Sequence, residues 1–247
     1  MLNIELENLI NKKLNSKLIK DYCPNGLQIE GKKEVKKIIT GVTSCKVLLE
    51  VAIEQNADAI IVHHGYFWKN ENIKIIGIKR NHFKKILKNN INLYVWHLPL
   101  DYHIKLGNNI QLANILKINI TDFINPLVVK GKFNKLFNAK SLKKKLEIDL
   151  NNNIFYYGKT GSNFIKTVAL CAGSGQKFIE ISLNKKVDAY ITGDKSEQCI
   201  NFAKENNLHF YSAGHYSTEK FGIKALSEWL FKKYKFDVSF IDIPNPA

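Results

Sequence analysis

Two adjacent histidines, His63 and His64, end an apolar run in the segment IIVHHGYFW, residues 60–68. A buried strand usually ends in aliphatic side chains, so two imidazoles at this place indicate chemistry. Imidazole and carboxylate groups are the usual nitrogen and oxygen ligands of divalent transition metals. Adjacent side chains of an extended strand point to opposite faces, which suits two metal ions better than one. A histidine pair alone is also compatible with a structural role.

Polar side chains also follow three later apolar runs. His97 and Asp101 form an H-x-x-x-D pattern, Asp194 follows a Thr-Gly pair, and His215 and Glu219 form an H-x-x-x-E pattern. Because ligands of α/β sheets gather beyond the carboxyl ends of strands, we expect these residues to mark a site. Each spacing is common by chance, and Glu219 also suits the first turn of a capped helix. Only the whole set predicts a metal site.

The elements that must position these residues alternate between strands and helices. Apolar residues at helical spacing predict helices, and short apolar runs that end in Gly, Asn or Pro predict strands. The expected helices cover residues 4–20, 46–56, 83–90, 107–118, 139–147, 176–186 and 220–234. The expected strands, several of which run into loops, lie within residues 36–44, 58–65, 91–101, 167–175, 188–198, 207–219 and 236–246. The segment DYCPNGLQIEG, residues 21–31, is predicted to be a loop with a turn at Asn25-Gly26.

The pattern of the first half of the chain returns in the second half. Asp188 stands 130 residues after Asp58, and His215 stands 118 residues after His97, with similar strand and helix patterns around each pair. We interpret this as the internal duplication of a strand–helix–strand–helix–strand unit. The alternative is a chance similarity between two α/β stretches.

This interpretation predicts an α/β protein of two duplicated halves, each a β-sheet flanked by helices. The predicted halves are residues 1–124 and 125–247, which act as one functional unit with a dinuclear metal site in the cleft between them. Residues 125–165 differ from their surroundings, because short β-like runs such as NIFYYGKT alternate with charged turns. They are either an inserted module or the start of the second half.

The charge of the chain is a weak guide to its partners. The formal net charge is +15, but the 37 basic residues include a single arginine, Arg80. Lysine, asparagine and isoleucine are all abundant, as expected from AT-rich codons. Readers of DNA usually need arginine at phosphates and at guanine edges. We therefore expect solvated lysine faces, with a nucleic-acid surface as the less favoured alternative.

Cysteine usage and hydropathy point to a cytoplasmic protein. The chain has no C-x-x-C motif, which argues against a structural zinc ribbon and favours free thiols in a reducing compartment, at Cys23, Cys45, Cys171 and Cys199. No apolar run approaches the ~18–20 residues of a membrane span. The first 18 residues form an acidic amphipathic pattern without the features of a signal peptide. We expect no membrane partner.

Five motifs in this order resemble the Nif-three-like family, whose members are called GTP cyclohydrolase 1 type 2 homologues: DYCPNGLQIEG, VHHGYFW, WHLPLDYHIKLGNN, ITGDKSEQ and AGHYSTEKFG. The resemblance covers essentially the whole chain. It implies a dinuclear metal centre with His63, His64, Asp101, His215 and Glu219 as ligands. One ion would bind His63 and Asp101, the other His64 and His215, and Glu219 would bridge the two.

Two further residues are expected to support this centre. His97 would orient a metal-bound imidazole through hydrogen bonding, and Asp194 would line the site. The chain departs from the family pattern at Gly65, where many members have Pro, and at Asp194, where many have Glu. Gly65 is expected to make its loop freer without removing a ligand. The shorter Asp194 weakens the case for its direct contact with substrate or metal.

The resemblance and the ligand types predict a hydrolase that uses two divalent ions, Zn, Fe or Mn, to activate a bridging water. The substrate would be a small molecule such as a nucleotide, although the sequence has no P-loop and no arginine pair to hold a triphosphate. The family is associated with ring-shaped hexamers, which implies a homo-oligomer. It also implies the alternative function of a non-catalytic metal-binding scaffold or regulator whose lysine-rich ring engages nucleic acid. In a third interpretation, the metals only hold the two halves together.

Overall fold

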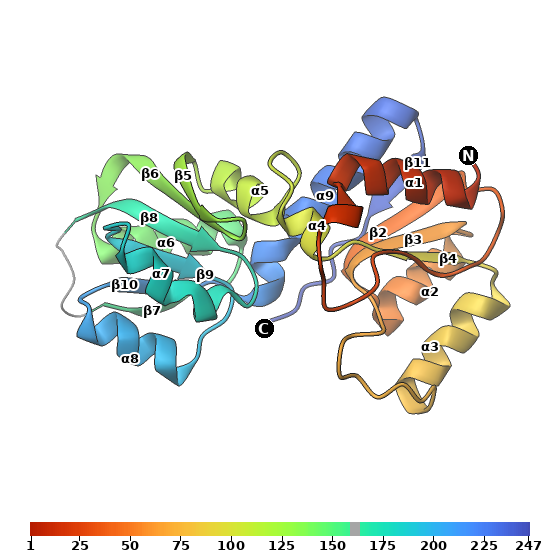
Figure 1. Cartoon of the computed structure of the whole chain (residues 1–247), viewed down its shortest axis with the longest axis horizontal. Helices are drawn as coiled ribbons and strands as arrows, with labels where there is room; N and C mark the ends of the chain where they lie inside the picture. Colours follow the sequence, from red (N-terminus) through yellow and green to blue (C-terminus); the bar gives the residue numbers. More distant parts are fainter. Residues whose placement is uncertain (159–163) are drawn as a thin grey trace. The chain divides into compact units, whose positions relative to one another are not determined.

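Two β-sheets organise the chain (Figure 1). The computed structural model describes residues 1–158 and 164–247. The chain divides into a first unit, Met1–Leu106 with Gly222–Ile243, and a second unit, Gly107–Phe221 with Pro244–Ala247. These limits differ from the predicted division after residue 124, because the strand that ends at Asn125 belongs to the second sheet and the last strand belongs to the first.

The elements follow one another in the α/β order expected from the sequence. The helices are α1 (Asn3–Leu14), α2 (Lys46–Glu54), α3 (Gly77–Lys88), α4 (Leu98–Asp101), α5 (Asn108–Ile115), α6 (Ala139–Leu150), α7 (Ile179–Leu183), α8 (Glu197–Glu205) and α9 (His215–Tyr234), with the 3-10 turns η1 (Ser16–Leu18) and η2 (Gly175–Phe178). The strands are β1 (Gly26–Ile29), β2 (Lys37–Thr43), β3 (Ala59–His64), β4 (Asn92–Val95), β5 (Ile118–Asn125), β6 (Val128–Phe137), β7 (Phe155–Tyr157), β8 (Ile165–Cys171), β9 (Ala189–Thr192), β10 (His209–Ser212) and β11 (Asp237–Phe240).

The sheet of the first unit has the strand order β1-β4-β3-β2-β11. Its strands β4, β3, β2 and β11 are parallel, and β1 is antiparallel to β4. Helices α2 and α3 cover one face (Figure 1). On the other face, the Tyr94 hydroxyl donates to the Asn3 carbonyl of α1 at 3.0 Å, and the Thr40 and Ser227 hydroxyls of β2 and α9 lie 2.6 Å apart. Helices on both faces explain why β2, β3 and β4 are buried along almost their whole length.

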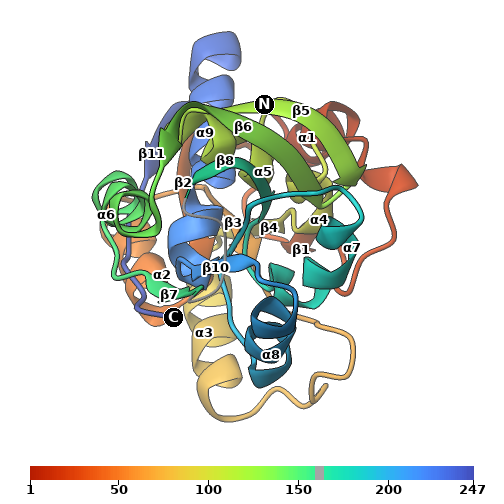
Figure 2. The same cartoon turned by 90° about the vertical axis from the view of Figure 1, so that its left-hand side faces the viewer.

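The sheet of the second unit has the strand order β5-β6-β8-β9-β10-β7. Strands β8, β9 and β10 are parallel, and the other neighbouring pairs are antiparallel. Helices α5 and α6 pack on one face, and α7 and α8 pack on the other (Figure 2). Within the segment 125–165, the described residues therefore contribute β6 and β7 to this sheet and α6 to the helices that cover it. The last two residues of the predicted run NIFYYGKT lie outside the described residues.

The two units repeat the same arrangement internally. Each contains three consecutive parallel strands, β2-β3-β4 or β8-β9-β10. In the first unit, the Asp58 carboxylate accepts hydrogen bonds from the backbone N–H groups of residues 36 and 37, both at 2.9 Å. In the second, the Asp188 carboxylate accepts from those of residues 166 and 167, at 2.9 and 2.8 Å. The predicted repeat thus has a counterpart in topology and hydrogen bonding, and its origin by duplication stays a prediction.

Several predicted boundaries were wrong. The predicted loop 21–31 contains β1, whose short run was hidden between Asn25-Gly26 and Gly31. Helix α8 was missed, although the Ser196 hydroxyl accepts from the backbone of Cys199 and caps it. Helix α9 begins at His215 rather than at residue 220. The polar residues of its first turn concealed the helical pattern.

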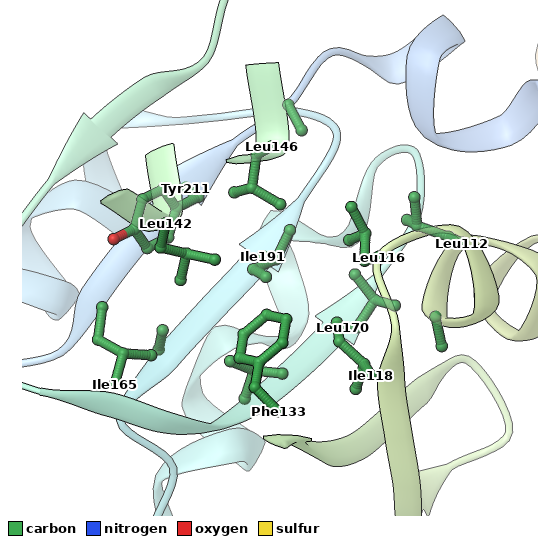
Figure 3. Packing of buried hydrophobic residues seen from close by; sticks show 14 of the residues in the cluster. Leu112, Leu116, Ile118, Phe133, Leu142, Leu146, Ile165, Leu170, Ile191 and Tyr211 are labelled. Carbon is green, nitrogen blue, oxygen red and sulfur yellow. The ribbon is translucent and has the colours of Figure 1, made fainter. Parts of the chain in front are cut away.

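The interior of the second unit offers a direct test of the packing. Leu146 of α6 is fully buried and points into the cluster that contains Phe133 and Ile191 (Figure 3), whereas Ile148 on the same helix is 69% exposed. We expect Leu146→Ala to lower the free energy of unfolding by about 2–5 kcal/mol, through lost transfer energy and a cavity. Ile148→Ala, the matched control, should change it by less than about 0.5 kcal/mol. Denaturant unfolding measures both, and equal losses would refute the packing of α6.

Two general features follow from the described residues. All four cysteines are free thiols, as the sequence predicted. Within residues 1–158 and 164–247, no helix combines the length and the apolar character that crossing a membrane requires.

Candidate metal centre

The predicted site residues lie beyond the carboxyl ends of parallel strands in each unit. In the first unit, His64 ends β3, and His97 and Asp101 follow β4. We call His63, His64, Asp101 and His97 the first half-site. In the second unit, Asp194 follows β9 and His215 follows β10; we call Asp194, His215 and Glu219 the second half-site. The expectation that strand ends would deliver these groups is confirmed within each unit.

His63 is held in one orientation by its own unit. The side chain is fully buried, and its Nδ1 lies 3.0 Å from the Trp96 carbonyl oxygen. A carbonyl only accepts hydrogen bonds, so this contact places the proton of a neutral His63 on Nδ1. The lone pair then belongs to Nε2, which lies 3.6 Å from Oδ1 of the buried Asp101. One imidazole nitrogen and one carboxylate oxygen therefore face each other.

The adjacent histidines do not diverge as an extended strand predicted. The ring centroids of His63 and His64 lie only 4.6 Å apart. His64 is the last residue of β3, and its ring nevertheless lies beside that of His63. The His64 Nδ1 lies 3.3 Å from the Thr43 hydroxyl on β2. Both imidazoles thus belong to one local group.

His97 is held by a carboxylate that sequence reasoning did not select. Its Nδ1 lies 2.7 Å from Oδ1 of Asp21, whose side chain is 2% exposed. The other Asp21 oxygen accepts from the Leu98 N–H and the Asn25 side-chain amide, both at 2.8 Å. Burial raises the pKa of the Asp21 carboxyl, but the hydrogen bonds from His97, Asn25 and the Tyr22 N–H outweigh burial and lower the pKa below its usual value. The only feature of the sequence that could have drawn attention to Asp21 was its place in the predicted turn DYCPN.

In the second half-site, a helix and a strand end hold one imidazole between two carboxylates. His215 and Glu219 are four residues apart on α9, which places them on one face. The His215 Nε2 lies 2.9 Å from Glu219 Oε2, and its Nδ1 lies 3.0 Å from Asp194 Oδ2. The Ser174 hydroxyl donates to the same Asp194 oxygen at 2.6 Å. Asp194, predicted only to line the site, therefore orients His215.

The two carboxylates control the protonation of His215 in the metal-free protein. Burial lowers the pKa of His215, but Asp194 and Glu219 outweigh burial and raise it from 6.5 to about 10. Because the pKa in the folded chain lies above that in the unfolded chain, the stability from this charge is complete below pH ~6.5. It is lost as the pH rises through about 10. A metal ion that binds Nε2 must displace this proton.

We expect the imidazole of His215 to stay protonated between about pH 7 and 8 when metal is absent, because its pKa is about 10. Heteronuclear NMR of the side chains measures this, and Asp194→Asn should lower the pKa of His215. His103 is an internal control, since burial and the nearby Lys13 lower its pKa below 6.5. Loss of the His215 proton near pH 6.5 in the wild type would contradict the expected effect of the carboxylates.

Two glycines leave no room for a side chain beside the half-sites. A Cβ at Gly173, whose φ is +58°, would lie 1.7 Å from Glu219 Oε1. Sequence reasoning missed this residue, for which the glycine-rich run CAGSG was the available signal. Gly65 was expected to make its loop freer, yet its Cβ would lie 2.1 Å from Val95 Cγ2. Gly65 therefore allows close packing against Val95, and the expectation of a freer loop stays a prediction.

The donors present fit a divalent transition metal. Each half-site offers imidazole nitrogen and carboxylate oxygen, the mixed set that suits Zn, Fe or Mn. Anchors at Nδ1, namely the Trp96 carbonyl for His63 and Asp194 for His215, fix the rings as supporting groups do for metal-bound histidines. Within each unit, residues predicted as metal ligands therefore lie together, with oriented donor atoms.

The fold and these donors define an α/β protein with two helix-flanked sheets and groups that could hold metal. A family model for Duf34/NIF3 (NGG1p interacting factor 3) matches residues 1–246. An Escherichia coli K12 relative named GTP cyclohydrolase 1 type 2 homolog is 53% identical over 247 residues, with both chains fully covered. The chain belongs to the Duf34/NIF3 family.

Two solved structures have the same fold over their full length. A structure described as the protein ybgI, of unknown function, is 53% identical, with a TM-score of 0.99 and complete coverage of both chains. A structure of TTHA1606 from Thermus thermophilus is 31% identical, with a TM-score of 0.89 and the same coverage. The resemblance derived from the five motifs is confirmed.

Proposed function

We propose that the protein is a hydrolase that depends on two divalent metal ions, held by five ligands from both half-sites: His63, His64, Asp101, His215 and Glu219. The observation that carries this proposal is the pairing, within each unit, of an anchored imidazole with a carboxylate. His63 faces Asp101 at 3.6 Å and His215 faces Glu219 at 2.9 Å. Such preformed pairs resemble metal sites from which the ion has been removed.

The residues of the chain would position and balance the ions. A bound pair of divalent ions supplies an acidified water and stabilises negative charge that develops on oxygen. The Trp96 carbonyl and Asp194 hold the ligating rings in place, and Glu219 would bridge the ions. Of the proposed ligands, only Asp101 and Glu219 are carboxylates, so the ligands themselves carry less negative charge than two divalent ions carry positive charge. Ions that keep positive charge toward the open side of the site would support hydrolysis of a nucleotide or a related small molecule.

GTP is the first substrate to test, because the Escherichia coli relative is named a GTP cyclohydrolase 1 type 2 homolog. The chain has one arginine, Arg80, so any phosphate groups would be neutralised by lysine point charges.

We also propose, from the family resemblance, that the protein assembles as a homohexamer and acts in the cytoplasm. The repeated Asp58 and Asp188 hydrogen bonds support an origin of the two units by duplication.

The testing experiment begins with metal analysis of protein purified without added metal. We expect about two transition-metal ions per chain, as in two-metal hydrolases. The protein is then stripped with a chelator, reloaded with Zn, Fe or Mn, and assayed with GTP and other nucleotides. Turnover should vanish on stripping and return on reloading. Protein that neither contains these ions nor takes them up would refute the proposal. A large fall in thermal stability on stripping, without turnover in any metal form, would favour metals with a purely structural role.

A further inference from the structure

The first unit contains a third imidazole beside the two predicted ligands. One ring nitrogen from each of His63, His64 and His97 lies within 4.8 Å of those of the other two. The ring centroid of His97 is 5.1 Å from that of His63 and 5.8 Å from that of His64. All three side chains belong to the first unit, so this group does not depend on the second half-site.

Each of the three rings is engaged at Nδ1 by its own unit. The contacts are 3.0 Å from His63 to the Trp96 carbonyl, 3.3 Å from His64 to the Thr43 hydroxyl, and 2.7 Å from His97 to the Asp21 carboxylate. In a neutral ring, a carbonyl or carboxylate at Nδ1 places the proton there and leaves the Nε2 lone pair for a ligand, as at His63 and His97, whereas the Thr43 hydroxyl beside His64 can donate or accept. Metal-bound histidines almost always have such a partner, most often a carboxylate or a backbone carbonyl. His97 has the stronger of these partners.

The contacts of His97 fix both its ring and its backbone. Asn25 accepts the backbone N–H of His97 at 2.8 Å. The ring of Trp68 meets the His97 ring edge-on, with centroids 4.9 Å apart. Asp21 joins these contacts, because it binds the ring of His97 and the Asn25 amide together. The DYCPN segment therefore fixes the orientation of the His97 imidazole through Asp21 and Asn25.

The second unit supplies a parallel for this arrangement. His215 follows the third parallel strand of its unit, as His97 does, and its Nδ1 lies 3.0 Å from the Asp194 carboxylate. In both units an aspartate thus holds the imidazole that follows the third strand. The aspartates come from different places, the DYCPN segment and the end of β9, so the shared feature is the oriented ring. His215 is one of the proposed ligands, and the parallel extends this role to His97.

We propose that His97 donates directly to a divalent ion in the first half-site, alongside His63 and His64, and that Asp21 is its positioning residue. The inference rests on the proposed function in one respect only, namely that the first half-site binds metal. It requires neither hydrolysis nor a second ion. His97 would add a third imidazole to the donors of the first half-site, a nitrogen-rich set that suits zinc, iron or cobalt.

The test titrates chelator-stripped full-length protein with Co²⁺ and follows the visible absorption band, which reports the donors bound to the ion. His97→Ala should weaken Co²⁺ binding at least about 100-fold and change the band at saturation, because a nitrogen donor is lost. Asp21→Asn should weaken binding about 10–100-fold, the usual effect of losing a supporting group. Asp58→Asn is the matched control. Asp58 also accepts hydrogen bonds from backbone N–H groups in the first unit, but none of its partners among the described residues is an imidazole. The Asp58→Asn variant should therefore bind Co²⁺ as tightly as the wild type.

The outcomes separate this inference from the proposed hydrolase. Wild type that binds Co²⁺ but shows no turnover would refute the hydrolase and leave His97 as a donor. If His97→Ala and Asp21→Asn bind Co²⁺ as tightly as the wild type, with the same band, His97 is not a donor. Should His97→Ala fail to fold, as judged by its thermal melt, His97→Gln and Asp21→Asn decide the question by the same two measurements.

Discussion

Replacing Glu219 with alanine is expected to remove most of the metal bound by the protein. Glu219 is buried on α9, its Oε2 faces His215 Nε2 at 2.9 Å, and Gly173 leaves space for its other oxygen. A carboxylate that bridges two ions contributes to both, so its loss should reduce the content from about two ions per chain to less than about one. Inductively coupled plasma mass spectrometry of the purified variant measures this content.

Glu228→Ala is the matched control for this experiment. Glu228 lies on the same helix, is largely exposed and pairs with Lys232 at 3.1 Å, outside both half-sites. Its replacement should leave the metal content unchanged. If Glu219→Ala retains as much metal as Glu228→Ala while both remain folded, Glu219 is not a ligand and the dinuclear proposal fails.

Replacing Asp101 with alanine is expected to lower kcat/KM by at least about 100-fold without unfolding the chain. Asp101 ends the single turn of α4, and its Oδ1 lies 3.6 Å from His63 Nε2. The loss of metal-assisted charge stabilisation is worth several kcal/mol, which corresponds to a fall in kcat/KM of about 10²–10⁴-fold. Steady-state kinetics on whichever nucleotide the wild type hydrolyses measures this fall, and circular dichroism checks the fold.

Asp122→Ala provides the comparison for Asp101. Asp122 is a half-exposed residue of β5 that pairs with Lys185 at 3.0 Å, away from the half-sites. Its replacement should leave kcat/KM within about twofold, as expected for a surface substitution. If kcat/KM of the Asp101 variant equals that of Asp122→Ala, the first half-site has no catalytic role. Salt-dependent binding of nucleic acid that survives in both variants would support the scaffold alternative instead.

Much of the framework could be predicted because its signals are local. The strands that became β2 and β3 are apolar runs buried on both faces, and α2 has an apolar stripe at helical spacing. The run of β3 ends in His63 and His64, so the position of His64 followed from the pattern. The start of α9 did not follow, because a first turn of His, Tyr, Ser and Thr lacks an apolar stripe.

The supporting residues of the site could not be predicted because their roles depend on distant contacts. Asp21 reaches His97 across 76 residues of sequence, and nothing in DYCPN specifies that partner. Gly173 matters only because Glu219, far along the chain, packs against it. The ligand set itself came from resemblance rather than from spacing. The adjacent histidines show the limit of a local rule, since their rings lie 4.6 Å apart although both residues belong to β3.

The sheet of the first unit has a consequence for how the chain folds as the ribosome makes it. Strand β2 needs β11 at its edge, and the face that carries Thr40 is covered partly by α9. In the nascent first unit, the edge of β2 that pairs with β11 therefore stays unpaired until residues 222–243 have left the exit tunnel. The second unit is almost continuous in sequence and can close earlier. We expect folding during synthesis to run against the N-to-C order that is usual for multidomain chains. Limited proteolysis of released chains that end at residue 221, which are no longer held in the tunnel, should digest the first unit before the second.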